Sequence, residues 1–474
     1  MKRTALAVLL LSLLCLGGRP PREAGLEQRL RNSFRRPERN GWVYVHLEGS
    51  PAEIGFQHGY LLAPEIEDMI RVEQLTLTHD SGKKWAFYRD AAGTVFLPHV
   101  EQQYRDELQG MVDGLRARGA SVDLVDVVAL NAWMELSPYY TNWYDKQHRN
   151  STDLARRRPL PVPEHCSAFV ATGAYTKDGR PVIAHNNWTD YIDGARWNII
   201  FDVVPSAGHR FLMDGAPGFI DSGDDFGMND SGLVITETTI GHFAGFDPAG
   251  IPEFVRARKA MQYATNIDEF AAIMKEGNNG GYANNWLVAD MRAGEVASLE
   301  LGLKHVTLLR TKDGYFVGSN FPANAELIRD ETDFPVNDMS ISENARHIRW
   351  EQLMAENKGK IDVAAAQRFL ADHYDTYAKV TGPSERTLCG HIDLSPRGSK
   401  PWQPAYGPAG AVQNKAADAA MTGSMSFTAA MGHSCGIGFR AAEHMKEHPQ
   451  FAWEKALLRD LPSEPWTTFS AAQP

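Results

Sequence analysis

Cysteine and long apolar runs are both scarce in this sequence. There are 4 cysteines in 474 residues, which excludes a small scaffold held by many disulfides. Apart from an N-terminal run, no stretch approaches the roughly eighteen apolar residues of a membrane-spanning helix. Positive charge is also in deficit, because the net charge is −11. This balance argues against nucleic acid or an anionic membrane surface as a standing partner.

Several familiar site signatures are missing as well. The G-x-S-x-G elbow of serine hydrolases is absent, and so are phosphate-cradling glycine motifs. His391 and Asp393 are close in sequence, as are His433 and Cys435, but neither pair has a recognised zinc spacing. The sequence therefore predicts no metal site. Papain-like catalysis needs a cysteine at the start of a helix, whereas the residues after Cys166 are typical of a strand.

The first eighteen residues have the layout of a cleaved secretory signal. Lys2 and Arg3 precede an apolar run from Ala5 to Leu16, and small residues follow. We expect a secreted or periplasmic protein without a stable membrane anchor, and a poorly ordered leader over 19–40. A lipoprotein anchor through Cys15 is the alternative, although Leu14 stands where a small residue is normally required.

Removal of such a signal leaves three cysteines, Cys166, Cys389 and Cys435. An odd number in an oxidising compartment leaves at least one thiol unpaired within the chain. We predict a Cys389–Cys435 disulfide that closes a loop-rich segment, with Cys166 free. A free thiol in an exported protein is a liability, and a catalytic role is one reason to keep it.

The hydrophobic pattern changes its period at Cys166. Before it, Ser50, Pro51 and Glu53 form a helix start, and 123–136 indicates another helix. After it, residues alternate in paired runs typical of hairpins: 167–176 with 180–187, 198–204 with 209–215, 226–229 with 232–240, 285–291 with 295–301, and 305–310 with 314–320. Helices are predicted from Asn266 to Gly277 and near 343–357 and 362–373, and loops over 381–430. The expected class is α+β, with antiparallel sheets covered by helices.

A cysteine at the head of a strand becomes a chain terminus if the bond before it is cut. Its own α-amine, with an unperturbed pKa of about 7.7 to 8.0, then serves as general base for its thiol. The same thiol can make the first cut by attacking the carbonyl of His165. This predicts a mostly helical light chain over 41–165 that stays associated with a heavy chain over 166–474.

Several stretches of the chain also resemble the phospholipase B-like family of N-terminal nucleophile hydrolases. More distantly they resemble penicillin acyltransferase and the choloylglycine (bile salt) hydrolases. The stretches are GSPAEIGFQHGYLLAPEI (49–66), HCSAFVATG (165–173), VIAHNNW (182–188), GMNDSGLVITETTI (227–240), FVRARKAM (254–261), GGYANNWLVAD (280–290) and VGSNFP (317–322). The resemblance implies a four-layered αββα fold, self-cleavage between His165 and Cys166, and no metal or organic cofactor.

The resemblance also assigns site residues. Cys166 matches the nucleophile and Asn320 an amide that helps form the oxyanion hole, with Asn285 as a second candidate donor. The catalytic stretch is matched by His185 and Trp188, and Asn187 stands where the family has threonine. Residues matched to substrate binding are Thr239, Arg258, Asn186 and Trp286. The alternative interpretations are core packing for His185 and Trp188 and a surface ion pair for Arg258.

The expected function is that of an exported, self-processing cysteine hydrolase acting on acyl amide or ester bonds of lipid-like substrates. The neutral amides and aromatic residues predict faster cleavage of N-acyl amides than of phospholipid esters, because a headgroup phosphate would need an arginine cluster or a helix N-terminus. Two alternatives are an acyltransferase, in which an amine or alcohol replaces water, and a non-catalytic lipid- or peptide-binding protein on the same fold.

Overall fold

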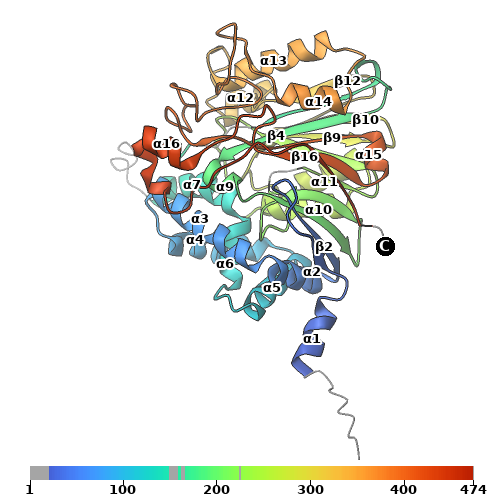
Figure 1. Ribbon diagram of the computed structural model, residues 1–474, viewed down its shortest axis with the longest axis vertical. Coiled ribbons are helices and arrows are strands. Elements are labelled where there is room, and N and C mark those ends of the chain that lie inside the picture. Colours follow the sequence, from blue (N-terminus) through green and yellow to red (C-terminus); the bar gives the residue numbers. More distant parts are fainter. Residues whose placement is uncertain (1–20, 149–158, 162–165, 224–225, 473–474) are drawn as a thin grey trace, which may run out of the picture.

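Four layers make up the molecule. The computed structural model describes residues 21–148, 159–161, 166–223 and 226–472, without the side chains of 21–24. Two β-sheets stack face to face, and helices cover the outer face of each (Figure 1). The αββα fold expected from the sequence is confirmed. The expected signal at 1–18 and His165 lie outside the described residues.

The larger sheet has nine strands in the order β1-β2-β5-β6-β7-β8-β9-β10-β11. Its neighbours pair antiparallel except β2 and β5, which are parallel. The strands are β1 (Phe34–Arg35), β2 (Val43–Gly49), β5 (Ile199–Pro205), β6 (Phe211–Gly215), β7 (Gly227–Asn229), β8 (Leu233–Thr239), β9 (Asn284–Asp290), β10 (Glu295–Leu301) and β11 (Val306–Thr311). Because β2 precedes Cys166 and β5 follows it, the expected light and heavy chains share one sheet.

The second sheet is fully antiparallel and has six strands in the order β12-β3-β4-β15-β16-β17. The strands are β3 (Ser167–Thr172), β4 (Val182–Asp190), β12 (Gly314–Gly318), β15 (Ala409–Asp418), β16 (Ser426–Met431) and β17 (Thr467–Ser470). A separate two-stranded pair joins β13 (Tyr374–Asp375) to β14 (Val380–Thr381). Small and branched side chains such as Ala168, Ile183 and Val234 fill the space between the two large sheets.

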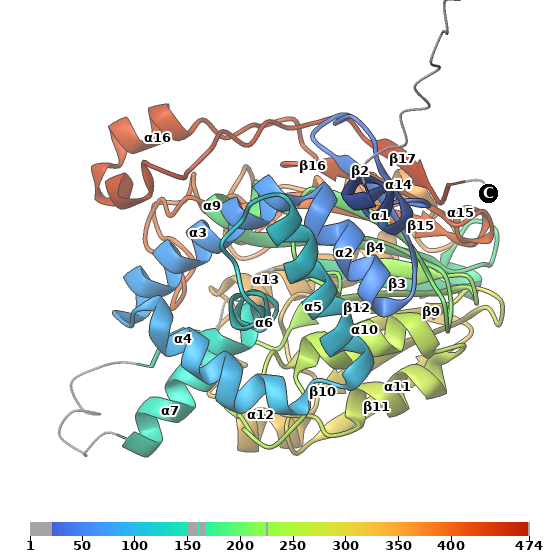
Figure 2. The same cartoon turned by 90° about the horizontal axis from the view of Figure 1, so that it is seen from below.

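The helices over the nine-stranded sheet come mainly from before Cys166, and Figure 2 shows this layer from below. They are α1 (Pro21–Arg29), α2 (Pro51–Leu61), α3 (Ala63–Ser81), α4 (Trp85–Ala91), α5 (Gln102–Ala117), α6 (Leu124–Asn131), α7 (Thr141–His148), α10 (Glu253–Tyr263) and α11 (Ile267–Lys275). Between α6 and α7 runs a π-helical turn, Glu135–Tyr140. The expected helix caps are present: Glu53 accepts from the backbone N–H of Ser50 at 2.8 Å, and Asn266 accepts from that of Glu269 at 3.0 Å.

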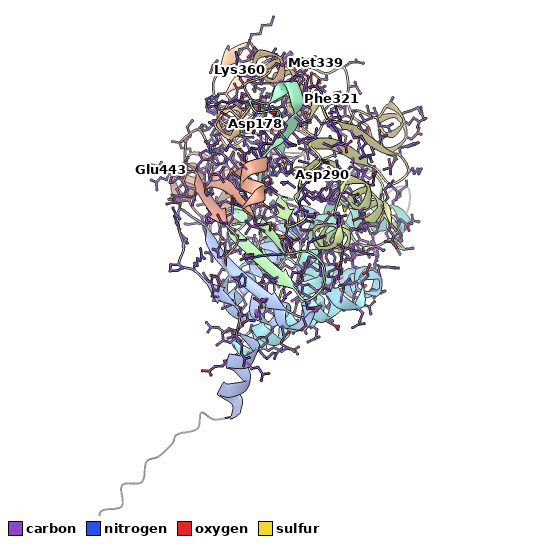
Figure 3. The ribbon with its side chains drawn as sticks, turned by 90° about the vertical axis from the view of Figure 1, so that its right-hand side faces the viewer. Asp178, Asp290, Phe321, Met339, Lys360 and Glu443 are labelled. Atoms are coloured by element: carbon purple, nitrogen blue, oxygen red, sulfur yellow. The ribbon has the colours of Figure 1, made fainter. Side chains whose placement is uncertain are left out.

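The helices over the six-stranded sheet are α12 (Ala325–Glu331), α13 (Ser342–Glu356) and α14 (Val363–Leu370). In Figure 3, Met339 and Lys360 mark this end of the molecule, opposite α1. Three short α-helices remain in the described part of the chain, α9 (Tyr191–Gly194), α15 (Ala419–Gly423) and α16 (Ala441–Glu447). Among the described residues, no helix combines the length and the apolar character needed to cross a membrane.

Four of the five predicted hairpins form, and the fifth does not. β11 pairs with β10 in the nine-stranded sheet, whereas β12 pairs with β3 in the six-stranded sheet. The turn at Lys312 and Asp313 therefore carries the chain from one sheet to the other. A tight turn fixes the reversal of direction, but only tertiary packing decides which neighbour each strand pairs with.

Three further expectations need correction. The segment 381–430, predicted as loops, contains β15, which lies inside the six-stranded sheet between β4 and β16; its small residues hide the alternation that marks a strand. Residues 21–29 and 34–35 of the expected disordered leader form α1 and β1. The predicted Cys389–Cys435 disulfide is not formed, because both thiols are free.

Candidate active site

Strands β3 and β4 place Cys166 in a pocket at the end of the sheet sandwich. Cys166 directly precedes β3 and is only 3% exposed. Because Ser167 lies opposite Asn186 in the antiparallel register, Cys166 adjoins Asn187 at the next position of β4. The pocket is lined by Trp133, Met134, Ser137, Cys166, Asn187, Trp188, Thr189, Trp197, Thr239 and Tyr282.

The Cys166 thiol faces two oxygen acceptors. Its Sγ lies 3.5 Å from Asn187 Oδ1 and 3.9 Å from Glu237 Oε1. Asn187 is itself 3% exposed, and its Nδ2 has no hydrogen-bond acceptor among the described residues. A buried amide N–H without an acceptor is costly. This one lies beside the thiol, so it is placed to donate to an oxyanion formed there.

Glu237, on β8, places a carboxylate beside the thiol. Its Oε1 accepts from the Tyr282 hydroxyl at 3.0 Å. With the amide of Asn284 oriented as its hydrogen bonding requires, Asn284 Nδ2 donates to Glu237 Oε2 at 2.8 Å. These two bonds hold the carboxylate where it can take the thiol proton. The motif GLVITETTI contains Glu237, but its carboxylate could not be distinguished there from an ordinary strand residue.

His185 completes a close group with Cys166 and Glu237. One possible ligand atom from each of the three lies within 4.8 Å of the other two. Burial, with a smaller effect of the Lys415 charge, holds the pKa of His185 well below its usual range, so the ring is neutral at physiological pH. Neither ring nitrogen has a hydrogen-bond partner among the described residues. A thiol, an imidazole and a carboxylate are acid-base groups, and the same set can also bind a transition metal.

Arg346, on α13, connects Cys166 to the rest of the site. Its guanidinium donates to the Cys166 carbonyl at 2.5 Å and to Asn320 Oδ1 at 2.9 Å. It also lies over the Trp188 ring, 4.5 Å from the centroid. Five fixed donors suit such multiple contacts. Sequence reasoning missed this residue, because α13 carries none of the matched motifs.

Asn320 lies in this network and Asn285 does not. Asn320 adopts a φ of 65°, and its Nδ2 donates to the Thr239 carbonyl at 2.8 Å. Asn285 Oδ1 instead accepts from Ser298 at 2.6 Å, and Asn285 does not line the pocket. Successive strand residues point to opposite faces. Asn284, one residue earlier on β9, is therefore the member of the pair that reaches Glu237.

Three predicted substrate-binding residues lie away from the pocket. Arg258 is buried on α10 and forms an ion pair with Glu107 of α5 at 3.0 Å. Asn186 donates to the Leu388 carbonyl at 2.9 Å. Trp286 packs in the core edge-on to Phe270, with ring centroids 5.6 Å apart. All three hold the fold together.

The fourth predicted substrate-binding residue, Thr239, does line the pocket. Trp133, Met134 and Ser137 supply a wall from before Cys166, so the expected light chain contributes to the site. The pocket volume is about 30 Å³, room for a water molecule or two in the uncut chain. No lysine or arginine is among the described residues that line the pocket.

Comparisons with known proteins agree with the motifs. A family model described as Phospholipase B matches residues 89–309. An uncharacterized protein of Archaeoglobus fulgidus is 27% identical over 281 residues, covering 54% of this chain and 42% of that protein. A putative phospholipase B-like 1 of Caenorhabditis elegans is 24% identical over 331 residues, covering 63% and 56%.

A solved structure, a variant of conjugated bile acid hydrolase from Clostridium perfringens, aligns over 56% of this chain and 89% of that chain. The TM-score is 0.34 and the identity 11%. The matched part of this chain spans about half the length of the curated relatives. The resemblance to the phospholipase B-like family is confirmed.

Proposed function

We propose that this chain, a relative of the phospholipase B-like proteins, is an exported hydrolase that cuts itself before Cys166 and then cleaves acyl amide or ester bonds with that cysteine. The observation that carries the proposal is the thiol at the head of β3, buried beside Glu237, His185 and the unused amide N–H of Asn187. A nucleophile, bases and an oxyanion donor are the parts that acyl transfer needs.

Maturation is the first step. Glu237 takes the thiol proton and Sγ attacks the carbonyl carbon of His165, with the developing oxyanion facing Asn187. The C–N bond breaks as the proton passes to the leaving nitrogen, which becomes the free α-amine of Cys166. Water then hydrolyses the thioester, releasing the His165 carboxylate and restoring the thiol. Apart from this water, the step uses only groups of the chain itself.

Turnover repeats this chemistry on an external acyl group. The freed α-amine of Cys166 is the base, since its unperturbed pKa of about 7.7 to 8.0 lets it exchange protons near neutrality. It passes the thiol proton to the leaving amine or alcohol and then activates water against the acyl-enzyme. Arg346 holds the Cys166 carbonyl and so fixes the terminus during both half-reactions.

The substrate class is an apolar acyl chain joined through an amide. Trp133, Trp188, Trp197 and Met134 supply apolar walls. Arg258, the matched basic residue, is neutralised by Glu107, and the described residues that line the pocket include no arginine cluster of the kind that a phosphate headgroup would need. N-acyl amides are therefore expected to be cleaved faster than phospholipid esters of matched chain length.

Two other functions use the same pocket. An acyltransferase would pass the acyl group from the Cys166 thioester to an amine or alcohol instead of water. A non-catalytic lipid- or peptide-binding protein would need no new terminus. Product analysis with and without an added amine acceptor separates the first from a hydrolase, and the intact mass of the mature protein separates the second.

The test begins with purified protein and its Cys166→Ala variant. Wild type is expected as two associated fragments, the heavier beginning at Cys166, and the variant as one chain. The ratio kcat/KM is then compared for an N-acyl amide and a diacyl phospholipid. An intact, fully active wild-type chain would contradict the proposal. A higher value on the phospholipid that falls when its headgroup is shortened would overturn the amide preference.

A further inference from the structure

A second cluster of cysteine and histidine side chains lies in the C-terminal part of the chain. His373, Cys389, His391 and Cys435 each bring one sulfur or nitrogen atom to a common point, with all four atoms within 4.8 Å of one another. They come from three segments: the loop after α14, the loop after β14 and the loop after β16. Cys389 and His391 are buried, and His373 and Cys435 are half-buried.

We propose that these four residues form a tetrahedral transition-metal site, with zinc as the metal, that has a structural role. Two thiolates and two imidazoles are a common ligand set of closed zinc sites. In such a site, with zinc–ligand bonds of roughly 2.1 to 2.3 Å, neighbouring ligand atoms lie about 3.3 to 3.8 Å apart. His391 Nε2 and Cys435 Sγ are already 3.4 Å apart, so only small side-chain shifts are needed.

The surroundings orient the ligands as a metal site requires. The other ring nitrogen of His391, Nδ1, has no hydrogen-bond partner among the described residues and lies 3.7 Å from Asp393 Oδ1, so a small rotation of the ring would give the carboxylate-histidine arrangement that fixes a metal-binding ring. The backbone N–H of Ile437 points at Cys435 Sγ at 3.5 Å and favours a thiolate there. The half-buried pair leaves a path by which the ion can enter.

His433 is close but belongs to the wall of the site. Its ring stacks on that of His391 with centroids 3.7 Å apart. Both of its nitrogens are engaged, Nε2 with the Tyr191 hydroxyl at 2.8 Å and Nδ1 with the Cys389 carbonyl at 3.2 Å. The tetrad with two sulfurs is therefore the better site than the alternative of His391, Asp393 and His433.

The position of the cluster gives the metal its role. Gly390, between two of the ligands, has a φ of 63°, and a Cβ there would lie 2.1 Å from the Trp188 ring. Trp188 lines the pocket of Cys166. A bound ion would tie three distant segments together and hold the loop that supports this wall. Binding of the divalent ion releases the two thiol protons to solvent.

The metal site and a Cys389–Cys435 disulfide exclude each other, which makes the inference testable. Full-length protein, purified without chelators and with any tag removed, is analysed for bound metals by mass spectrometry. One zinc per chain is expected in wild type and in Cys166→Ser, and loss of the ion in Cys389→Ser, Cys435→Ser and His373→Ala. Cys166→Ser is the matched control, because it removes the pocket thiol but leaves the tetrad.

Cobalt replacement tests the site in folded wild-type protein, so its result does not depend on whether the ligand variants fold. The folded wild-type protein loaded with Co²⁺ should show thiolate-to-cobalt charge transfer and the visible bands of a tetrahedral ion. These signals should persist in Cys166→Ser. A folded, metal-free wild type with Cys389 and Cys435 either bridged in non-reducing peptide maps or both free would overturn the proposal. Loss of the metal in Cys166→Ser alone would place the ion in the pocket instead and would equally overturn it.

Discussion

The amide of Asn187 is the residue-scale feature that most separates this pocket from an ordinary core. Buried polar atoms are nearly always hydrogen-bonded, and a free N–H beside a nucleophile is a preorganised donor for charge that develops during reaction. Asn285, proposed from motif matching, has its side chain engaged with Ser298. The two residues therefore make a matched pair for experiment.

Asn187→Ala is expected to slow both self-cleavage and kcat by about 10²- to 10³-fold, the usual effect of removing one oxyanion donor. KM should change little, because the bond strengthens only in the transition state. Self-cleavage followed by gel electrophoresis provides a readout that requires no known substrate. Asn285→Ala is the control and should stay within a few-fold of wild type; the opposite ranking of the two variants would restore the assignment made from sequence.

Arg258 has a buried ion-pair partner that the sequence alone did not reveal. It is buried with Glu107 in an ion pair between α10 and α5. Removing one partner of a buried pair leaves the other charge unpaired, at a cost of about 3 to 5 kcal/mol. The side chain therefore contributes to stability, and it is not among the residues that line the pocket of Cys166.

Arg258→Ala should lower the free energy of unfolding by about 3 to 5 kcal/mol in urea denaturation, while the KM of the folded fraction stays unchanged for acidic and neutral substrates alike. The double variant Arg258→Met, Glu107→Leu should regain most of that stability, since it leaves no unpaired charge. A selective rise in KM for anionic substrates, without loss of stability, would return Arg258 to the binding site.

At the scale of elements, α2 and α5 pack with their backbones in close approach. Gly55 and Gly59 of α2 face the α5 backbone, and Gly110 and Gly114 of α5 face the α2 backbone. A Cβ on Gly59 would lie 2.1 Å from the Met111 carbonyl oxygen. The two helices approach this closely because glycine has no side chain, and together they cover the sheet that carries Glu237.

Gly59→Ala is expected to destabilise the fold by about 3 kcal/mol, because the clash is with backbone and the helices must move apart. Gly25→Ala is the control. Gly25 lies in α1, and a Cβ there meets nothing within 4 Å, so that variant should be neutral or slightly stabilising. Equal unfolding midpoints for both variants and wild type would show that the α2–α5 contact has room for a Cβ at position 59.

At the scale of the whole molecule, the segments on either side of Cys166 are one folded unit. β2 pairs with β5, and one core joins residues such as Ile54 and Leu108 to Phe201 and Val288. A cut before Cys166 would leave these contacts unchanged. The proposed maturation therefore predicts two fragments that co-elute in size-exclusion chromatography without denaturant.

Buried carboxyl groups should make stability fall as the pH rises from about 4 to about 8. Burial raises the pKa of Glu454 to about 8, and that of Glu135 and Asp193 to about 7, whereas unfolded carboxyls titrate near 4. Between these pKa values the folded state holds protons that the unfolded state has released, so the stabilisation is lost progressively from about pH 4 and is gone above about pH 8. Buried His58 and His433, with pKa values lowered to about 3 by burial, oppose the trend only below about pH 6.5.

Glu454→Gln should flatten the dependence on pH between 7 and 8 by about 1 kcal/mol per pH unit. The measurement is the free energy of unfolding in urea at several pH values for wild type and variant. The same comparison near pH 3.5 controls for structural damage, because there Glu454 is largely protonated in both the folded and the unfolded state. Parallel curves for the two proteins would mean that Glu454 is ionised when folded.

The sequence by itself determined what depends on neighbours along the chain. Caps such as Asn266, four hairpins, the change from helices to strands at Cys166, and the α+β class all follow from local pattern and turn chemistry. Motif resemblance added the relationship to phospholipase B-like proteins and the proposal that Cys166 is the nucleophile. Each of these is a property of a few consecutive residues or of an ordered series of short stretches.

Only the tertiary structure decided which distant residues meet. It separated β11 from β12, paired Arg258 with Glu107, and brought Arg346 and Glu237 to Cys166. A side chain's partner across sheets is set by register and layer packing, which no local pattern encodes. For the same reason the sequence alone did not reveal the cluster of His373, Cys389, His391 and Cys435. Its members come together from separate loops only when the four layers are assembled.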